Sequence, residues 1–166
     1  LLEQPRRRQA CAGDTISVMD AANTEAGISV TKNLTIQGQG AASTTVDGGG
    51  SGPVFTVGGA VIATIQDMTI SNGSATSCCT GGGGIYNGGT LTVSNSTLSG
   101  NSATYSGGGI YNTGTLALIN STVSGNSSTY IGGGIYNAYR GTTTLINSTV
   151  SGNSGTFVGG GIYNDG

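Results

Sequence analysis

The stretch GGGIYN at residues 82–87 occurs again without change at residues 107–112, 132–137 and 159–164. The isoleucines of the four copies are separated by 25, 25 and 27 residues. A fixed period of this size is typical of a solenoid, in which one structural unit stacks on copies of itself. Two extra residues near Tyr139 and Arg140 explain the longer interval, and a stacked coil tolerates an insertion within one turn.

The residues between two copies alternate as β-strands do. In TLTVSNSTLSGNS, residues 90–102, Leu91 and Val93 alternate with polar residues, the alternation breaks at Asn95, and Leu98 is apolar again. This two-residue period indicates short strands, and residues 30–166 contain no helical stripe of apolar residues. We therefore expect an all-β solenoid with three short strands in each turn of about 25 residues.

Stacking places each residue over its copy in the next turn, about 4.8 Å away, so that identical residues form ladders. Isoleucines would fill the interior, and two sets of asparagines would pass hydrogen bonds from turn to turn. Tyrosines that alternate with the isoleucines would stack on the outside. The predicted ladders are Ile85, Ile110, Ile135 and Ile162; Asn95, Asn120 and Asn147; Asn101, Asn126 and Asn153; and Tyr86, Tyr111, Tyr136 and Tyr163.

The whole chain, residues 1–166, is expected to form one domain with three parts. Residues 1–30 would form an N-terminal segment with a short capping helix in RRRQACAGDTISV, because solenoids need an atypical end turn. Residues 31–80 would form degenerate turns, in which Asp67 and Gly73 take the places of Asn95 and Asn101. The regular GGGIYN turns would follow in residues 81–166.

Almost the whole chain resembles a known family. The resemblance lies in the segments GDTISV and ISVTKNLTIQGQG, followed by GGGIYNGGTLTVSNSTLSGNSA. The family is that of the bacterial right-handed parallel β-helix repeats of large secreted, surface-bound and autotransporter-like proteins. The resemblance implies a right-handed parallel β-helix located outside the cell or on its surface. It implies little about activity, because the same scaffold carries adhesins, polysaccharide-cleaving enzymes and inert stalks.

Composition argues against several kinds of chemistry. The chain has no histidine, and no charged residue lies between Asp67 and Arg140 or between Arg140 and Asp165. Paired carboxylates for sugar cleavage, and the repeated aspartates of a calcium-binding roll, are therefore missing. We expect no catalytic residues, no metal site and no cofactor. The net charge of −2 argues against nucleic acid, and no apolar segment is long enough to cross a membrane.

Three cysteines fit no zinc or redox motif. In an oxidising compartment Cys11 could form a disulfide with either Cys78 or Cys79, and the sequence does not choose between them.

Three functions remain as hypotheses. The first is a structural protein that stacks end to end, on a second copy or on further turns, through the edge formed by Ile162, Tyr163 and Asn164. The second is a glycan-binding module that uses the tyrosine column, with ice binding by a column of Thr97, Thr122 and Thr149 as a variant. The third is a polysaccharide lyase or hydrolase, for which only the scaffold argues.

Overall fold

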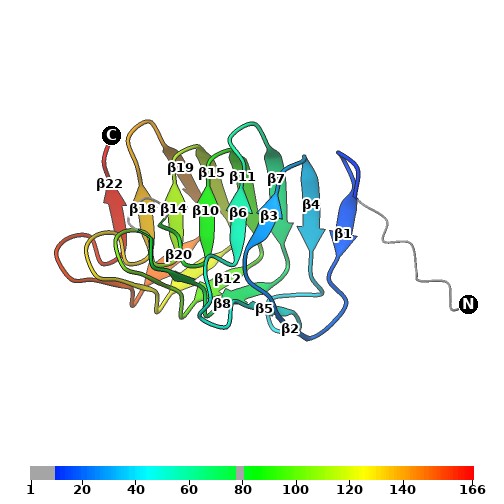
Figure 1. The fold of residues 1–166 in the computed structure, drawn as a ribbon, viewed down its shortest axis with the longest axis horizontal. Helices are drawn as coiled ribbons and strands as arrows, with labels where there is room; N and C mark the ends of the chain where they lie inside the picture. The colour runs from blue at the N-terminus through cyan, green and yellow to red at the C-terminus, as the bar shows by residue number, and fades with distance from the viewer. Residues whose placement is uncertain (1–9, 78–80) are drawn as a thin grey trace, which may run out of the picture.

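The computed structural model describes residues 10–77 and 81–166 and shows an all-β parallel solenoid. Three sheets of six strands and one of four run along it, so that five repeats of the coil separate the first and last strands of each longer sheet (Figure 1). The chain passes through the sheets in a fixed order, and each strand pairs in parallel with the strand of the next turn. The turns average about 27 residues.

We call the sheets A to D, and a regular turn passes through them in the order A, B, D and C. Sheet A contains β1 (Thr15–Ser17), β4 (Leu34–Gln37), β7 (Ile62–Gln66), β11 (Thr90–Ser94), β15 (Thr115–Ile119) and β19 (Thr142–Ile146). Sheet B contains β2 (Ala22–Thr24), β5 (Thr45–Asp47), β8 (Thr69–Ser71), β12 (Thr97–Ser99), β16 (Thr122–Ser124) and β20 (Thr149–Ser151).

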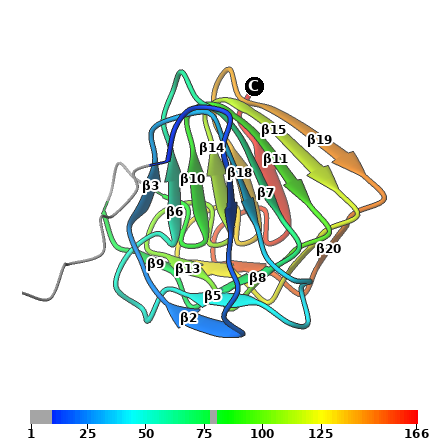
Figure 2. The ribbon, with the colours of Figure 1, turned by 90° about the vertical axis from the view of Figure 1, so that its right-hand side faces the viewer.

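Sheet D is the four-stranded sheet and contains β9 (Ser74–Ala75), β13 (Ser102–Ala103), β17 (Ser127–Ser128) and β21 (Ser154–Gly155). Sheet C contains β3 (Ile28–Val30), β6 (Phe55–Val57), β10 (Ile85–Asn87), β14 (Ile110–Asn112), β18 (Ile135–Asn137) and β22 (Ile162–Asn164). Viewed along the long axis, the sheets enclose a narrow interior (Figure 2).

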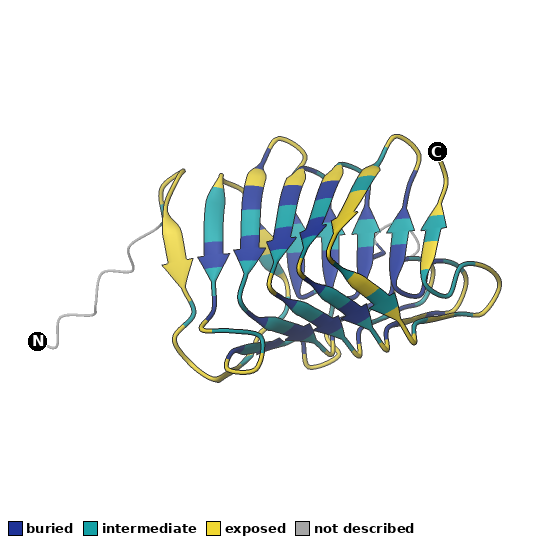
Figure 3. Ribbon diagram, turned by 180° about the vertical axis from the view of Figure 1, so that it is seen from behind, coloured by how far each residue is buried: buried dark blue, intermediate teal, exposed yellow. Residues whose placement is uncertain are grey.

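Strand alternation divides the side chains between this interior and the solvent. In β11 the pattern of burial places Leu91 and Val93 inside, as predicted, and the same alternation repeats in neighbouring turns (Figure 3). The interior is apolar and fully buried at Phe55, Ile85 and Leu98. Each turn contributes a few such side chains, so the core is thin but continuous along the axis.

The strands stay in register even where the sequence predicts an insertion. Thr115 pairs with Thr142, so the two added residues lie in the connection between β18 and β19 and leave both strands aligned. Arg140 has a left-handed φ of 69°, and Tyr139 is 67% exposed beneath its guanidinium, which lies 5.2 Å from the ring centroid. The insertion is therefore a projecting loop.

The expected N-terminal capping helix is not formed in the described part of its segment. Gly13 has a φ of +92°, which ends any helical path, and the following residues form β1. This strand pairs with β4 in register, Ile16 against Ile36, so its backbone hydrogen bonds are made across the sheet. Residues 6–9 of that segment lie outside the described residues.

Candidate functional site

The repeated GGGIYN segment packs against its own copies through its backbone. Its first glycine has a left-handed φ, as at Gly107 with +66°, which a residue with a Cβ adopts only with strain. A Cβ on the second glycine, Gly108, would overlap the carbonyl oxygens of Ser127 and Gly133. Positive φ and close approach of the backbone therefore both favour glycine in this segment.

The isoleucine of the segment faces the interior. Ile85, Ile110 and Ile135 are fully buried and pair in register. Ile162 continues this ladder at its C-terminal end, where it is 42% exposed.

The asparagine of the same segment forms a ladder that the sequence analysis missed. In each pair the Nδ2 of one asparagine donates to the Oδ1 of the next at 2.7 Å, from Asn87 to Asn112, from Asn112 to Asn137 and from Asn137 to Asn164. Within a turn, Oδ1 of Asn87 accepts from the backbone N–H of Gly89 at 3.1 Å. Asn87 and Asn112 are completely buried, so these amides close the corner between sheets C and A. Strand alternation was the available signal: if Ile85 points in and Tyr86 points out, Asn87 points in.

The second predicted set of asparagines also forms a buried ladder. Oδ1 of Asn126 accepts from both the backbone N–H and Nδ2 of Asn101, at 3.0 and 2.9 Å, and Asn153 accepts from Asn126 in the same way. Gly73 takes the asparagine position in the preceding turn and donates its N–H to Asn101. This ladder closes the corner between sheets B and D.

The first predicted set of asparagines lies in a different environment. Asn95, Asn120 and Asn147 have φ values of 49°, 49° and 48°, and they turn the chain from sheet A into sheet B. Asn120 donates to Asn95 at 3.4 Å, on the exposed surface. Their main contribution is the left-handed turn geometry, which asparagine tolerates better than most residues.

The tyrosines form a column on the outer face of sheet C. Ring centroids are 5.5 Å apart for Tyr86 and Tyr111, 4.9 Å for Tyr111 and Tyr136, and 5.7 Å for Tyr136 and Tyr163. The hydroxyl of Tyr136 donates to Asp165 at 3.1 Å. Partial burial, and then this hydrogen bond and the carboxylate charge, raise the pKa of Tyr136 to about 12.

A column of threonines lies on sheet B, where Thr97, Thr122 and Thr149 pair in register. Serines two residues further along each strand, at Ser99, Ser124 and Ser151, form a parallel column.

Side chains that bind metal ions are dispersed in the part of the chain that the structure describes. Across residues 10–77 and 81–166, no three His, Cys, Asp or Glu side chains are close enough to hold a metal ion. Cys11 is exposed, whereas Cys78 and Cys79 lie outside the described residues, so the disulfide stays a prediction. Over the same described ranges, no helix is long and apolar enough to span a membrane.

No protein-family profile, curated protein or solved structure matches the chain.

Proposed function

We propose that this chain is a non-enzymatic structural module of the cell surface or extracellular space, and that its regular turns extend by stacking on further turns of the same kind. The proposal rests on the contact between neighbouring turns, which is self-complementary. Isoleucine meets isoleucine, tyrosine meets tyrosine, and each asparagine donates to the same asparagine of the next turn. Each added turn therefore exposes the same kind of surface as the turn on which it stacks.

The last described turn presents this surface without a neighbour on its C-terminal side. Leu145 and Ile162 occupy interior ladder positions but are 38% and 42% exposed. A further turn would bury both side chains, at roughly 25 cal/mol for each Å² of apolar surface removed from water. It would also pair the free edges of the terminal strands β19, β20 and β22.

The residue that a new turn stacks against Asn164 decides how well that turn fits. Another GGGIYN turn would supply an amide oxygen to Nδ2 of Asn164, which otherwise donates to the carbonyl of Gly166 at 2.6 Å. The first turn of a second copy would instead place the Ile28–Val30 strand there, with Val30 beneath the asparagine. We therefore propose that regular turns extend the stack most strongly, and that head-to-tail contact of two copies is the weaker form of the same contact.

Sedimentation velocity and electron microscopy of the concentrated chain, with reductant present, test the head-to-tail contact. Ile162→Lys places a charge at the interior position and should leave a folded monomer. Ile146→Lys is the matched control, because Ile146 lies in the same turn but on the outer face, and it should assemble like the unaltered chain. Equal assembly of both variants, or an unaltered chain that stays monomeric, contradicts stacking between copies.

A further inference from the structure

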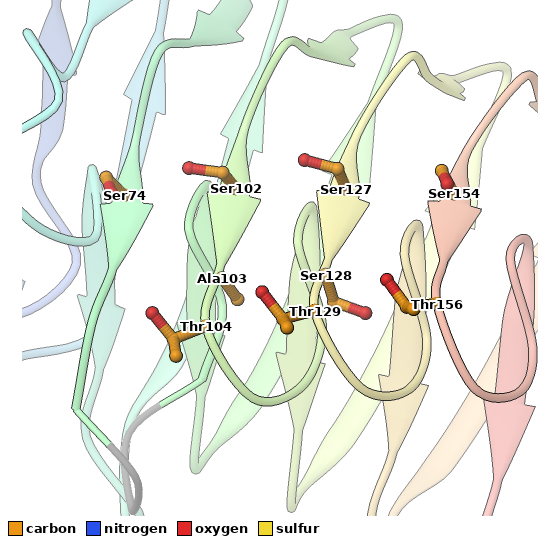
Figure 4. Close-up of a pocket in the computed structure, with 9 residues that line it drawn as sticks. All are labelled: Ser74, Ser102, Ala103, Thr104, Ser127, Ser128, Thr129, Ser154 and Thr156. Carbon is orange, nitrogen blue, oxygen red and sulfur yellow. The ribbon is translucent and has the colours of Figure 1, made fainter.

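A groove runs along sheet D, across successive turns of the solenoid. It encloses about 340 Å³, and its floor is made of small polar side chains. Figure 4 shows them in two rows, with one member of each row in a turn. The first row is Ser74, Ser102, Ser127 and Ser154, and the second is Thr104, Thr129 and Thr156.

The groove continues from this first hollow toward the N-terminal turns. A second hollow of about 320 Å³ adjoins it, and the two share Ser74 and Ser102. Glycines at positions 49, 50, 73 and 100 line much of this second part, so no large side chain interrupts the path. The groove is therefore long and open, as a chain-like ligand requires.

The hydroxyls on the groove floor are available to a ligand. Apart from a 3.5 Å hydrogen bond from Ser102 to the carbonyl of Gly73, none of the seven bonds through its side chain to another group in the described part of the chain. By contrast, Ser128, between the two rows, is buried and donates to the carbonyl of Ile131. The outward hydroxyls can therefore donate hydrogen bonds to a ligand and accept hydrogen bonds from it.

An aromatic ladder begins one residue beyond the threonine row. Tyr105 and Tyr130 stack with centroids 5.5 Å apart, and Phe157 follows at 5.2 Å. All three rings are exposed, by 38%, 44% and 68%. The segments that form the first hollow and this ladder carry no charged residue, because residues 68–139 and 141–164 contain none. Beside the second hollow, Asp47 accepts hydrogen bonds from Gly49 and Asn72.

We propose that this groove binds a neutral, extended polysaccharide that lies parallel to the solenoid axis. Sugars combine hydroxyl groups with apolar C–H faces. The groove offers hydroxyls on its floor, and the exposed aromatic rings follow its threonines by one residue, outside the residues that line it. An extended β-1,4-linked glycan advances by about 5 Å per sugar, close to the spacing of about 4.8 Å between turns. One sugar per turn can therefore lie beside one serine and one threonine.

The tyrosine column of sheet C, which the sequence analysis favoured for glycans, is less suited. The hydroxyl of Tyr136 is already bonded to Asp165. The groove on sheet D depends neither on that column nor on stacking at the solenoid ends, so its binding can be tested on the monomer.

Isothermal titration calorimetry with cellohexaose, xylohexaose and mannohexaose measures the binding, and polygalacturonate serves as a charged probe. We expect at least one neutral hexasaccharide to bind, and its trisaccharide to bind at least tenfold more weakly because it spans fewer turns. Absence of binding by all three hexasaccharides at millimolar concentration overturns the proposal. Equal or tighter binding of polygalacturonate overturns the neutral specificity.

Ser127→Tyr fills the centre of the groove and should weaken binding at least tenfold. The matched control is Ser124→Tyr, which makes the same change on the outer face of sheet B and should stay within twofold of the unaltered chain. Tyr130→Ala should weaken binding several-fold by interrupting the aromatic ladder. Equal affinity of the unaltered chain and both groove variants would contradict the assigned site.

Amide chemical-shift mapping of the unaltered chain locates the ligand without any substitution. The largest shifts should fall in residues 102–105, 127–130 and 154–157. Shifts concentrated on Tyr86, Tyr111 and their neighbours would place the glycan on sheet C and overturn the assignment.

Discussion

The turns before and after residue 80 share sheets A, B and C but close one corner with different chemistry. Between sheets C and A, the earlier turns bury Val30 and Val57, whereas the later turns bury Asn87, Asn112 and Asn137. Valine needs no hydrogen-bond partner, so it fits whatever its neighbours are. A buried amide is stable only when adjacent turns satisfy it, because an unpaired one costs about 1–3 kcal/mol.

The amide ladder explains why the later turns are nearly identical in sequence. An amide ladder makes each turn depend on the chemistry of the next, whereas an apolar corner asks only for suitable volume. Sequence repetition in residues 81–166 is thus a requirement of the hydrogen bonds as well as of the backbone. In the described part of the chain no buried side-chain nitrogen or oxygen lacks a partner, as this requirement demands.

The largest expected effect comes from the glycine contacts that bring regular turns together. Gly108→Ala would drive a Cβ into the backbone of the next turn, which cannot move as a side-chain end can. We expect a loss of at least about 4 kcal/mol in the free energy of unfolding, measured by denaturant titration. Gly125→Ala is the control: its Cβ meets nothing within 4 Å, and only its φ of +63° costs energy, about 1 kcal/mol. Equal losses would contradict the role of close approach.

Interrupting the amide ladder should have the next largest effect. Asn112→Ala leaves the Nδ2 of Asn87 and the Oδ1 of Asn137 without their ladder partners, and we expect about 3 kcal/mol of destabilisation. Asn120→Ala removes an exposed amide and should cost about 1 kcal/mol, mainly through its left-handed φ. Chemical denaturation of both variants checks the difference. A loss for Asn112→Ala no greater than for Asn120→Ala would mean that the ladder adds little.

Extending the ladder into the earlier turns should have a smaller effect. Val57 lies beside Asn87 in register, and Gly59 follows it at the same interval as Gly89 follows Asn87. In Val57→Asn the new amide can donate to Oδ1 of Asn87, so we expect a stability change within about 1 kcal/mol. Val93→Asn, also fully buried but between Ile65 and Leu118, should lose about 3 kcal/mol or more. Thermal unfolding of the pair measures the contrast, and similar losses would refute it.

The smallest effect concerns pH and the tyrosine column of the later turns. The pKa of Tyr136 rises from 10.0 to about 12 in the folded chain, because burial and Asp165 disfavour the phenolate. The neutral phenol therefore contributes stability below pH 10, and this contribution is lost as the pH rises from 10 to 12. Absorbance at 295 nm, compared with Tyr136→Phe, should show titration near pH 12, and Asp165→Asn should lower that pKa. A Tyr136 pKa near 10 would contradict the hydrogen bond.

The sequence predicted the features that depend on period and alternation. The repeat of 25–27 residues indicated stacked turns, and the alternation around Leu91 and Val93 identified the interior face. The sequence distinguished poorly between asparagines in turns and asparagines in buried ladders, because both positions favour this residue. Asn95 was expected in a ladder, and it bonds to Asn120 and Asp67 from an exposed left-handed turn. Asn87, in a fully buried ladder, was overlooked because the glycines and tyrosine beside it already had explanations.

The groove on sheet D was not predicted, again for a physical reason. Its strands are only two residues long, too short to show alternation, and its serines and threonines look like turn residues in the sequence. The repeat aligns Ser102, Ser127 and Ser154 in one row, but only the folded chain shows that this row lines a hollow. Likewise, residue Gly13 and the pairing of β1 replaced the expected helix, because tertiary pairing decided the conformation of that segment.

A series of chains with added regular turns tests the self-complementary contact most directly. Insertion of zero, one or two further copies of residues 107–131 after residue 131 lengthens every ladder without creating a new kind of contact. The free energy of unfolding should rise with each copy, because each adds one interface of identical residues. Unchanged or falling stability along the series would contradict the account, since neighbouring turns would then not stabilise one another.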